Sequence, residues 1–137
     1  MHEIELKADN GSIRFVFISH TADDDASEAY SLLKFEVYVT AYAFAGMATY
    51  EFFLGDTRNF VEQLHQAYDR VDGTAELQSE VEEFILTVTI KPDGHATASG
   101  VLKRSPYEST ALNFELAMDQ SYFGGFLADW KALLASV

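Results

Sequence analysis

Residues 84–94 have the sequence FILTVTIKPDG, which carries the clearest structural signal in the chain. Residues 84–90 alternate in polarity with a period of two and are rich in β-branched side chains, a pattern typical of a β-strand. Pro92, Asp93 and Gly94 then supply turn chemistry, because proline presets one backbone angle and glycine tolerates another. We therefore predict a strand over 84–90 that ends in a tight turn.

Further strands flank this segment. Strands are expected at residues 96–104, with Gly100 inside the strand, and at 110–118, where every other residue from Leu112 to Met118 is apolar. Sequential strands with short connections tend to pair, so these two segments and 84–90 are expected to form an antiparallel meander. A short acidic strand near 75–78 precedes the meander.

The first half of the chain also has strand periodicity. An opening β-hairpin is predicted, with positive φ angles at a two-residue Asn10-Gly11 turn. The strand that follows, 12–18, has apolar residues of both parities, which favours burial of both faces. A second hairpin is expected to join strands at 33–44 and 47–54 through Ala45-Gly46. Residues 20–31 form an exposed acidic loop in this interpretation.

Two segments have helical periodicity instead. One amphipathic helix is predicted at about 57–71, after a stop and N-cap at Gly55-Asp56, and another at about 120–135, capped by Asp119. Residues 1–137 are then a single acidic α+β domain, and the length of the chain fits one domain. Its seven or eight strands are mainly antiparallel and lie in a curved sheet or two packed sheets, covered by the two helices.

The charge balance restricts the function. The chain has 22 acidic and 9 basic residues, a net charge of −13, so contacts with nucleic-acid phosphates or an anionic membrane are disfavoured. The absence of cysteine excludes disulfides and thiolate metal sites and favours a reducing compartment. The first residues lack the features of a secretory signal, and no apolar run reaches the length of a membrane helix. A cytoplasmic location is expected.

The acidity is concentrated in the first part of the chain. Residues 1–83 hold 17 acidic and 5 basic residues, whereas residues 84–137 hold 5 and 4. Stretches 15–33 and 71–90 contain no basic residue and carry two acidic clusters. If the fold brings these clusters together, their field attracts a basic protein partner.

We therefore expect the partner-binding residues among the acidic clusters, with exposed tyrosines as anchors, since tyrosine is enriched at protein interfaces. The aromatic row between residues 38 and 52 is otherwise expected in the core, where the helices need a surface to pack on. The predicted partner-binding residues are Asp23, Asp24, Asp25, Glu28, Glu80, Glu82, Glu83, Tyr38 and Tyr42.

No motif points to catalysis. The four histidines lack the spacing of a metal site, and the acidic run at 23–28 lacks the glycine and glutamate positions of an EF-hand. The Gly-x-Ser-x-Gly nucleophile motif is absent. The sequence therefore predicts no catalytic residue, no metal site and no cofactor, and the protein is not expected to be an enzyme.

A set of turns, caps and core positions carries a family resemblance. They are Phe44-Ala45-Gly46, Gly55-Asp56 opening a helix, Lys91-Pro92-Asp93-Gly94, Gly100, Leu112-Asn113-Phe114 and Met118-Asp119-Gln120-Ser121-Tyr122. From residue 33 to the C-terminus this pattern resembles the bacterial WapI-type immunity proteins and their uncharacterised relatives. The resemblance implies that the protein binds and neutralises a cognate secreted toxin, often a nuclease, inside the producing cell. It implies no catalytic residues.

The resemblance and the charge suggest the same hypothesis. A basic toxin holds its substrate with Lys and Arg, and an acidic, non-enzymatic binding protein can occupy that surface. The alternative is a small-molecule-binding or oligomeric structural module of unknown ligand, and a homo-oligomer is compatible with either function. The gene immediately upstream separates the hypotheses, because immunity predicts a secreted protein with a C-terminal toxin domain there.

Overall fold

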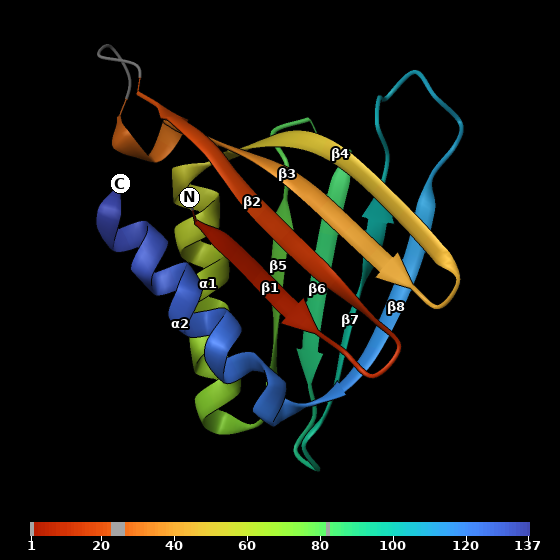
Figure 1. The fold of residues 1–137 in the computed structure, drawn as a ribbon. Helices are drawn as coiled ribbons and strands as arrows, with labels where there is room; N and C mark the ends of the chain where they lie inside the picture. The colour runs from red at the N-terminus through yellow and green to blue at the C-terminus, as the bar shows by residue number, and fades with distance from the viewer. Residues whose placement is uncertain (1, 23–26, 82) are drawn as a thin grey trace.

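The computed structural model describes residues 2–22, 27–81 and 83–137. This part of the chain forms two four-stranded antiparallel sheets and two α-helices, so the predicted α+β class with two packed sheets is confirmed (Figure 1). The first sheet contains, in spatial order, β1 (Glu3–Lys7), β2 (Gly11–Thr21), β3 (Leu32–Ala41) and β4 (Phe44–Phe53). The second contains β5 (Gly73–Gln78), β6 (Phe84–Ile90), β7 (His95–Leu102) and β8 (Leu112–Asp119). The helices are α1 (Leu54–Arg70), α2 (Phe123–Ser136) and the short 3₁₀ helices η1 (Glu28–Tyr30) and η2 (Gln120–Tyr122).

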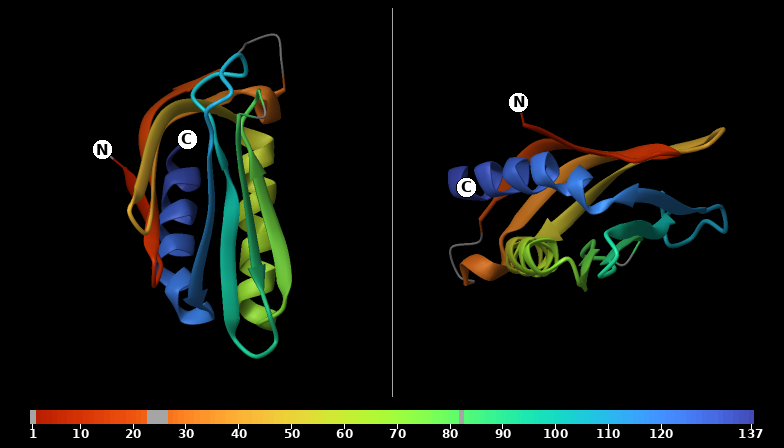
Figure 2. Two further views of the ribbon diagram at one scale, coloured as in Figure 1. Left: turned by 90° about the vertical axis from the view of Figure 1, so that its right-hand side faces the viewer. Right: turned by 90° about the horizontal axis from the view of Figure 1, so that it is seen from below.

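The sheets and helices enclose one hydrophobic core. On one side of this core α2 packs beside β1, and α1 packs beside β5 and β6 (Figure 2). The two helices also contact each other there. On the other side β4 contacts β7 and β8 directly. Neither α-helix of the described chain is long and apolar enough to cross a membrane.

The β3–β4 hairpin turns at a different place from the one predicted. Ala41 pairs with Phe44, so the turn is Tyr42-Ala43, and Tyr42 has a left-handed φ of 55°. The prediction of a turn at Ala45-Gly46 is wrong because Gly46 lies within β4. A Cβ at Gly46 would come within 3.2 Å of Leu102 and 3.3 Å of Leu112, so this glycine allows the two sheets to approach closely.

The first hairpin is confirmed, but its turn differs from the prediction. Neither Asn10 nor Gly11 has a positive φ, and the loop closes with a 2.8 Å hydrogen bond from the Ala8 amide to the Gly11 carbonyl. Gly11 is required for another reason, because a Cβ there would lie 2.0 Å from the carbonyl oxygen of Thr40. The turn residue Asn10 instead connects the two sheets.

Asn10 binds the outer edge of β8 with its side chain. Its Nδ2 donates to the Glu115 carbonyl at 3.0 Å, and its Oδ1 accepts from the Ala117 amide at 2.9 Å. The Asp9 amide adds a bond to the Ala117 carbonyl at 2.9 Å. The carboxamide therefore occupies the place of a neighbouring strand.

We expect Asn10→Ala to lower the free energy of unfolding by about 1–2 kcal/mol. The substitution removes two hydrogen bonds, and the cost stays moderate because water can reach the freed β8 groups. Urea unfolding followed by the fluorescence of Trp130, the sole tryptophan, measures the change. Asn113→Ala is the matched control, because Asn113 is exposed on the same strand and its side chain makes no hydrogen bond within the described residues. Equal losses in the two variants would contradict the assigned role of Asn10.

Strand β2 buries one face rather than two. Ile13 and Phe15 are fully buried, whereas Arg14 and Val16 are partly exposed and Ile18 is 46% exposed. The prediction of burial on both faces is wrong because both helices pack on the inner side of the first sheet, which leaves its outer face to solvent.

The acidic loop is shorter than predicted. β2 continues to Thr21, and η1 occupies Glu28–Tyr30. Ser31, predicted to be exposed, is buried; its Oγ donates to the Glu28 carbonyl at 2.7 Å and hydrogen-bonds His20 Nε2 at 2.9 Å. Only the centre of the predicted loop, at residues 23–26, lies outside the described residues.

Helix α1 begins earlier than the caps suggested. It starts at Leu54, so Gly55 and Asp56 lie in its first turn, and the predicted N-cap at Asp56 is wrong. The Leu54 amide donates to the carbonyl of Ser31, the residue that follows η1, at 2.9 Å, and the helix starts directly after β4. Asp119 does act as a cap, accepting from the Ser121 amide at 2.9 Å, but it caps η2, which leads into α2.

Candidate functional site

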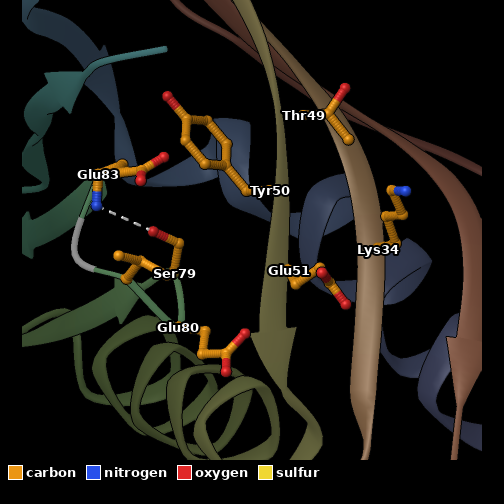
Figure 3. A pocket seen from close by; sticks show the side chains of 8 residues that line it. Lys34, Thr49, Tyr50, Glu51, Ser79, Glu80 and Glu83 are labelled. Atoms are coloured by element: carbon orange, nitrogen blue, oxygen red, sulfur yellow. Dashed lines mark hydrogen bonds between the residues drawn. The ribbon is translucent and has the colours of Figure 1, made fainter. Parts of the chain in front are cut away.

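An acidic pocket of about 170 Å³ lies between the end of β4 and the loop that connects β5 to β6 (Figure 3). Its lining includes the carboxylates of Glu51, Glu80 and Glu83 and one basic side chain, Lys34. Three carboxylates against one ammonium group give the pocket a net negative charge. The pocket is lined by Lys34, Thr49, Tyr50, Glu51, Ser79, Glu80, Val81 and Glu83.

Backbone hydrogen bonds hold the β5–β6 loop against both sheets. The Glu80 amide donates to the Glu51 carbonyl of β4 at 2.8 Å, and the Lys103 amide donates to the Glu83 carbonyl at 3.0 Å. Within the loop, the buried Ser79 hydroxyl accepts from the amides of Glu83 at 3.2 Å and Phe84 at 3.1 Å. The glutamates of the pocket are therefore presented from an anchored backbone.

Tyr50 forms the inner wall of the pocket. Its ring is buried, and its hydroxyl donates to the Lys103 carbonyl. Burial raises the pKa of the Tyr50 phenol well above its usual value, and the negative charge of Glu83 raises this pKa further. Tyr50 therefore stays neutral and serves as a fixed hydrogen-bond donor.

An apolar groove of about 370 Å³ lies at the other end of β4, between the β3–β4 turn and the β7–β8 connection. Phe44 is 69% exposed and Met47 is 48% exposed, so two large apolar side chains of β4 are open to solvent beside the groove. An ion pair between Arg104 and Glu108 lies on the rim. The groove is lined by Phe44, Ala45, Gly46, Met47, Leu102, Arg104, Glu108, Thr110, Ala111 and Leu112.

The structure brings only some of the predicted acidic residues together. Glu80 and Glu83 share the acidic pocket. Glu28 lies in η1, where it forms a 3.0 Å ion pair with Arg58 of α1. The neighbouring Tyr30 ring packs on Phe53, so η1 lies at the end of β4 that also contacts the β5–β6 loop. The predicted residues Asp23, Asp24, Asp25 and Glu82 lie outside the described residues.

Tyr38 lies apart from these acids, on the outer face of the first sheet. Its hydroxyl donates to Glu36 at 2.8 Å, and the Arg14 guanidinium lies 4.3 Å from the centre of its ring. The hydrogen bond to the Glu36 carboxylate raises the pKa of the Tyr38 phenol. Tyr38 is partly exposed and held in place on this face.

Tyr42 lies in the β3–β4 turn and is 83% exposed. The ten residues of β4 separate it from the η1 end by about 30 Å, at a rise of about 3.3 Å per residue. The expectation that the aromatic row is core holds for Tyr50 and Phe52, which are buried, but not for the partly exposed Tyr38, and it is wrong for the exposed Tyr42 and Phe44. The hairpin carries those two side chains to its exposed end.

Sequence reasoning missed most of the residues that line the two recesses, among them Lys34, Phe44, Met47 and Glu51. Phe44 was expected in the core because the two helices need a surface to pack on. Glu51 stood out only as one acid among 22. β4 lies at a sheet edge because of the order of the strands in the sheet. The local sequence pattern does not predict that order.

The arrangement is suited to binding. Carboxylates of the acidic pocket can accept hydrogen bonds from an ammonium or guanidinium group, and the groove can accept an apolar side chain.

Among residues 2–22, 27–81 and 83–137, no group of three His, Asp or Glu side chains is placed to hold a metal ion. His65 instead contacts Asp69 at 3.1 Å and Lys131 at 2.8 Å.

Comparison with known proteins relates this sequence to a family. The sequence signature described as the immunity protein WapI-like family matches residues 4–137. The chain belongs to the WapI-like immunity protein family. The match confirms the resemblance and extends it to β1 and β2. Searches of curated proteins and of solved structures gave no match. WapI-like membership associates the chain with an immunity function.

Proposed function

We propose that this WapI-like chain is an immunity protein that binds a toxin and neutralises it without catalysis, in the cytoplasm of the cell that makes the toxin. Family membership over residues 4–137 carries the proposal. The net charge of −13 supports a basic partner, such as a toxin domain that binds nucleic acid. Such a domain presents Lys and Arg where the phosphates of its substrate bind.

The acidic pocket supports a specific mode of inhibition. Glu51, Glu80 and Glu83 can take the place of substrate phosphates and pair with basic side chains of the toxin. Tyr38, on the outer face of the first sheet, and Tyr42, in the β3–β4 turn, are proposed as aromatic anchors away from this pocket. The proposed partner-binding acids are Asp23, Asp24, Asp25, Glu28, Glu80, Glu82 and Glu83, as predicted, together with Glu51.

The direct test uses the C-terminal domain encoded by the gene immediately upstream. We expect this domain to arrest growth when it is produced alone and to be harmless when it is co-produced with the chain. Purified together, the two proteins should elute as one complex in size-exclusion chromatography. A harmless domain, or one that arrests growth despite the chain, would contradict the proposed function.

The electrostatic mode gives a kinetic prediction. The double variant Glu80→Lys/Glu83→Lys should slow association with this domain about tenfold at low salt, because charge complementarity acts mainly on the association rate. The association rate of the variant should also depend less on salt than that of the wild type. Stopped-flow mixing at several salt concentrations measures both effects.

A matched variant controls for the change in net charge. Glu62→Lys/Asp129→Lys reverses two exposed acids on α1 and α2 and so produces the same net charge. Its association rate should stay close to that of the wild type if local charge at the acidic pocket controls binding. Equal slowing by the two double variants would show that only the overall charge of the molecule matters.

A further inference from the structure

Strand β4 has an outward edge whose backbone groups are free over part of its length. Ala41 and Phe44 form the closing hydrogen-bonded pair of the β3–β4 hairpin, so the even-numbered residues of β4 bond to β3. The odd-numbered residues therefore direct their amides and carbonyls away from the sheet, as the bond from the Glu80 amide to the Glu51 carbonyl shows. At Ala45, Met47 and Thr49 no described residue makes a hydrogen bond to these outward groups.

The other sheet edges are protected, each in its own way. At β5 the Gln63 side chain of α1 accepts from the Glu76 amide at 3.3 Å, and at β8 the Asp9-Asn10 turn occupies the edge. The short strand β1 carries charges at alternate positions, which discourage the addition of another strand. Residues 45–49 of β4 have the sequence AGMAT and carry no charge. This part of β4 therefore lacks the usual protection of an edge strand.

The free edge connects the two recesses. The apolar groove borders it at Phe44–Met47, and the acidic pocket borders it at Thr49–Glu51. Met47 and Glu51 are four residues apart, which corresponds to about 13 Å along a strand. A single extended segment can therefore contact both recesses while it pairs with the backbone between them.

We infer that an extended segment of the toxin adds as a strand to the outward edge of β4 at residues 45–49. It places an apolar side chain in the groove and a Lys or Arg side chain in the acidic pocket. Backbone hydrogen bonds supply affinity in this mode of recognition, and the flanking pockets supply specificity. This inference rests on the proposed function, because it describes how the proposed toxin is held.

Charge complementarity indicates which kind of segment binds to the outward edge of β4. The three carboxylates of the acidic pocket outnumber its one ammonium group, Lys34, so the pocket favours a cationic side chain. The other cations near the edge are Arg104, which is paired with Glu108, and the partly exposed Lys103. An acidic segment would place like charges together at the pocket, and a second copy of this strongly acidic chain would do the same.

Amide hydrogen exchange tests strand addition without any mutation. The probe is the C-terminal domain encoded by the gene immediately upstream, bound to the wild-type chain. Exchange at the Met47 and Thr49 amides should slow at least about tenfold in the complex, because these donors become hydrogen-bonded. The outward amide of Glu5, on the opposite edge of the same sheet, should exchange at an unchanged rate.

A proline variant tests the same contact by affinity. Thr49→Pro removes only an outward donor and leaves the β3–β4 ladder intact, so we expect it to fold and to bind this domain about 10–100-fold more weakly. Glu5→Pro makes the equivalent change on β1 and should bind as the wild type does. Circular dichroism checks that both variants are folded.

The outcomes separate the two proposals. If the wild type binds the domain but the Met47 and Thr49 amides exchange as fast as in the free chain, strand addition is wrong and the immunity function stands. If the wild type does not bind the domain, the proposed function fails, and strand addition fails with it.

Discussion

Phe15→Ala is expected to lower the free energy of unfolding by about 3–5 kcal/mol. Phe15 is fully buried on β2, at a point where both sheets and α2 meet. Truncation removes the ring and leaves a cavity that three packed elements cannot close together. The centroid of the Phe15 ring lies 5.1–6.4 Å from those of Phe35, Phe52, Phe84, Phe126 and Trp130.

The size of this loss in unfolding free energy shows whether Phe15 belongs to a core that both sheets and α2 share. Urea unfolding can be followed through Trp130, whose ring is buried and touches Phe15. Val16→Ala is the control, because Val16 is the next residue on the same strand and points to the outer face, where truncation should cost less than about 1 kcal/mol. Similar losses in the two variants would mean that β2 contributes no more through its inner face than through its outer face.

Periodicity predicted the elements whose pattern is local. The strand at Phe84–Ile90 and the turn at 92–94 follow the polarity pattern and the turn residues closely. Both helices were found from their apolar stripes. These features depend on neighbouring residues alone, and a single sequence contains that information.

The errors arose where a distant contact overrides a local preference. Gly46 suggested a turn, but this glycine is needed because Leu102 and Leu112 of the other sheet approach it. Tyr42 adopts a left-handed conformation although tyrosine gives no local signal for one. Asp56 suggested an N-cap, but the bond from the Leu54 amide to the Ser31 carbonyl begins the helix earlier.

The candidate site was less predictable than the fold. Composition showed that acidic residues are concentrated in the first part of the chain, and two of those predicted, Glu80 and Glu83, line one pocket. Which other side chains join them depends on strand order. Because β4 is an edge strand that contacts the β5–β6 loop, Glu51 and Lys34 join the pocket from the other sheet.

Gly100→Ala is expected to lower the free energy of unfolding by about 3 kcal/mol, at the upper end for an overpacked site. A Cβ at Gly100 of β7 would lie 1.9 Å from the Ile85 carbonyl oxygen and 3.1 Å from the Phe114 ring. The close atom belongs to the backbone of β6, so relief requires separation of two paired strands rather than rotation of a side chain.

A second glycine provides a control of opposite sign. Gly125 lies exposed in α2 with nothing within 4 Å of its would-be Cβ, so Gly125→Ala should stabilise the fold by up to about 1 kcal/mol through helix propensity. Thermal unfolding of the two variants measures both changes. Because Gly100 lies two residues before Leu102, which lines the apolar groove, any folded Gly100→Ala protein should also bind the proposed toxin partner less well. A Gly100→Ala chain as stable as the wild type would mean that β6 and β7 do not approach as closely as described, and the support of the groove by β7 would then need revision.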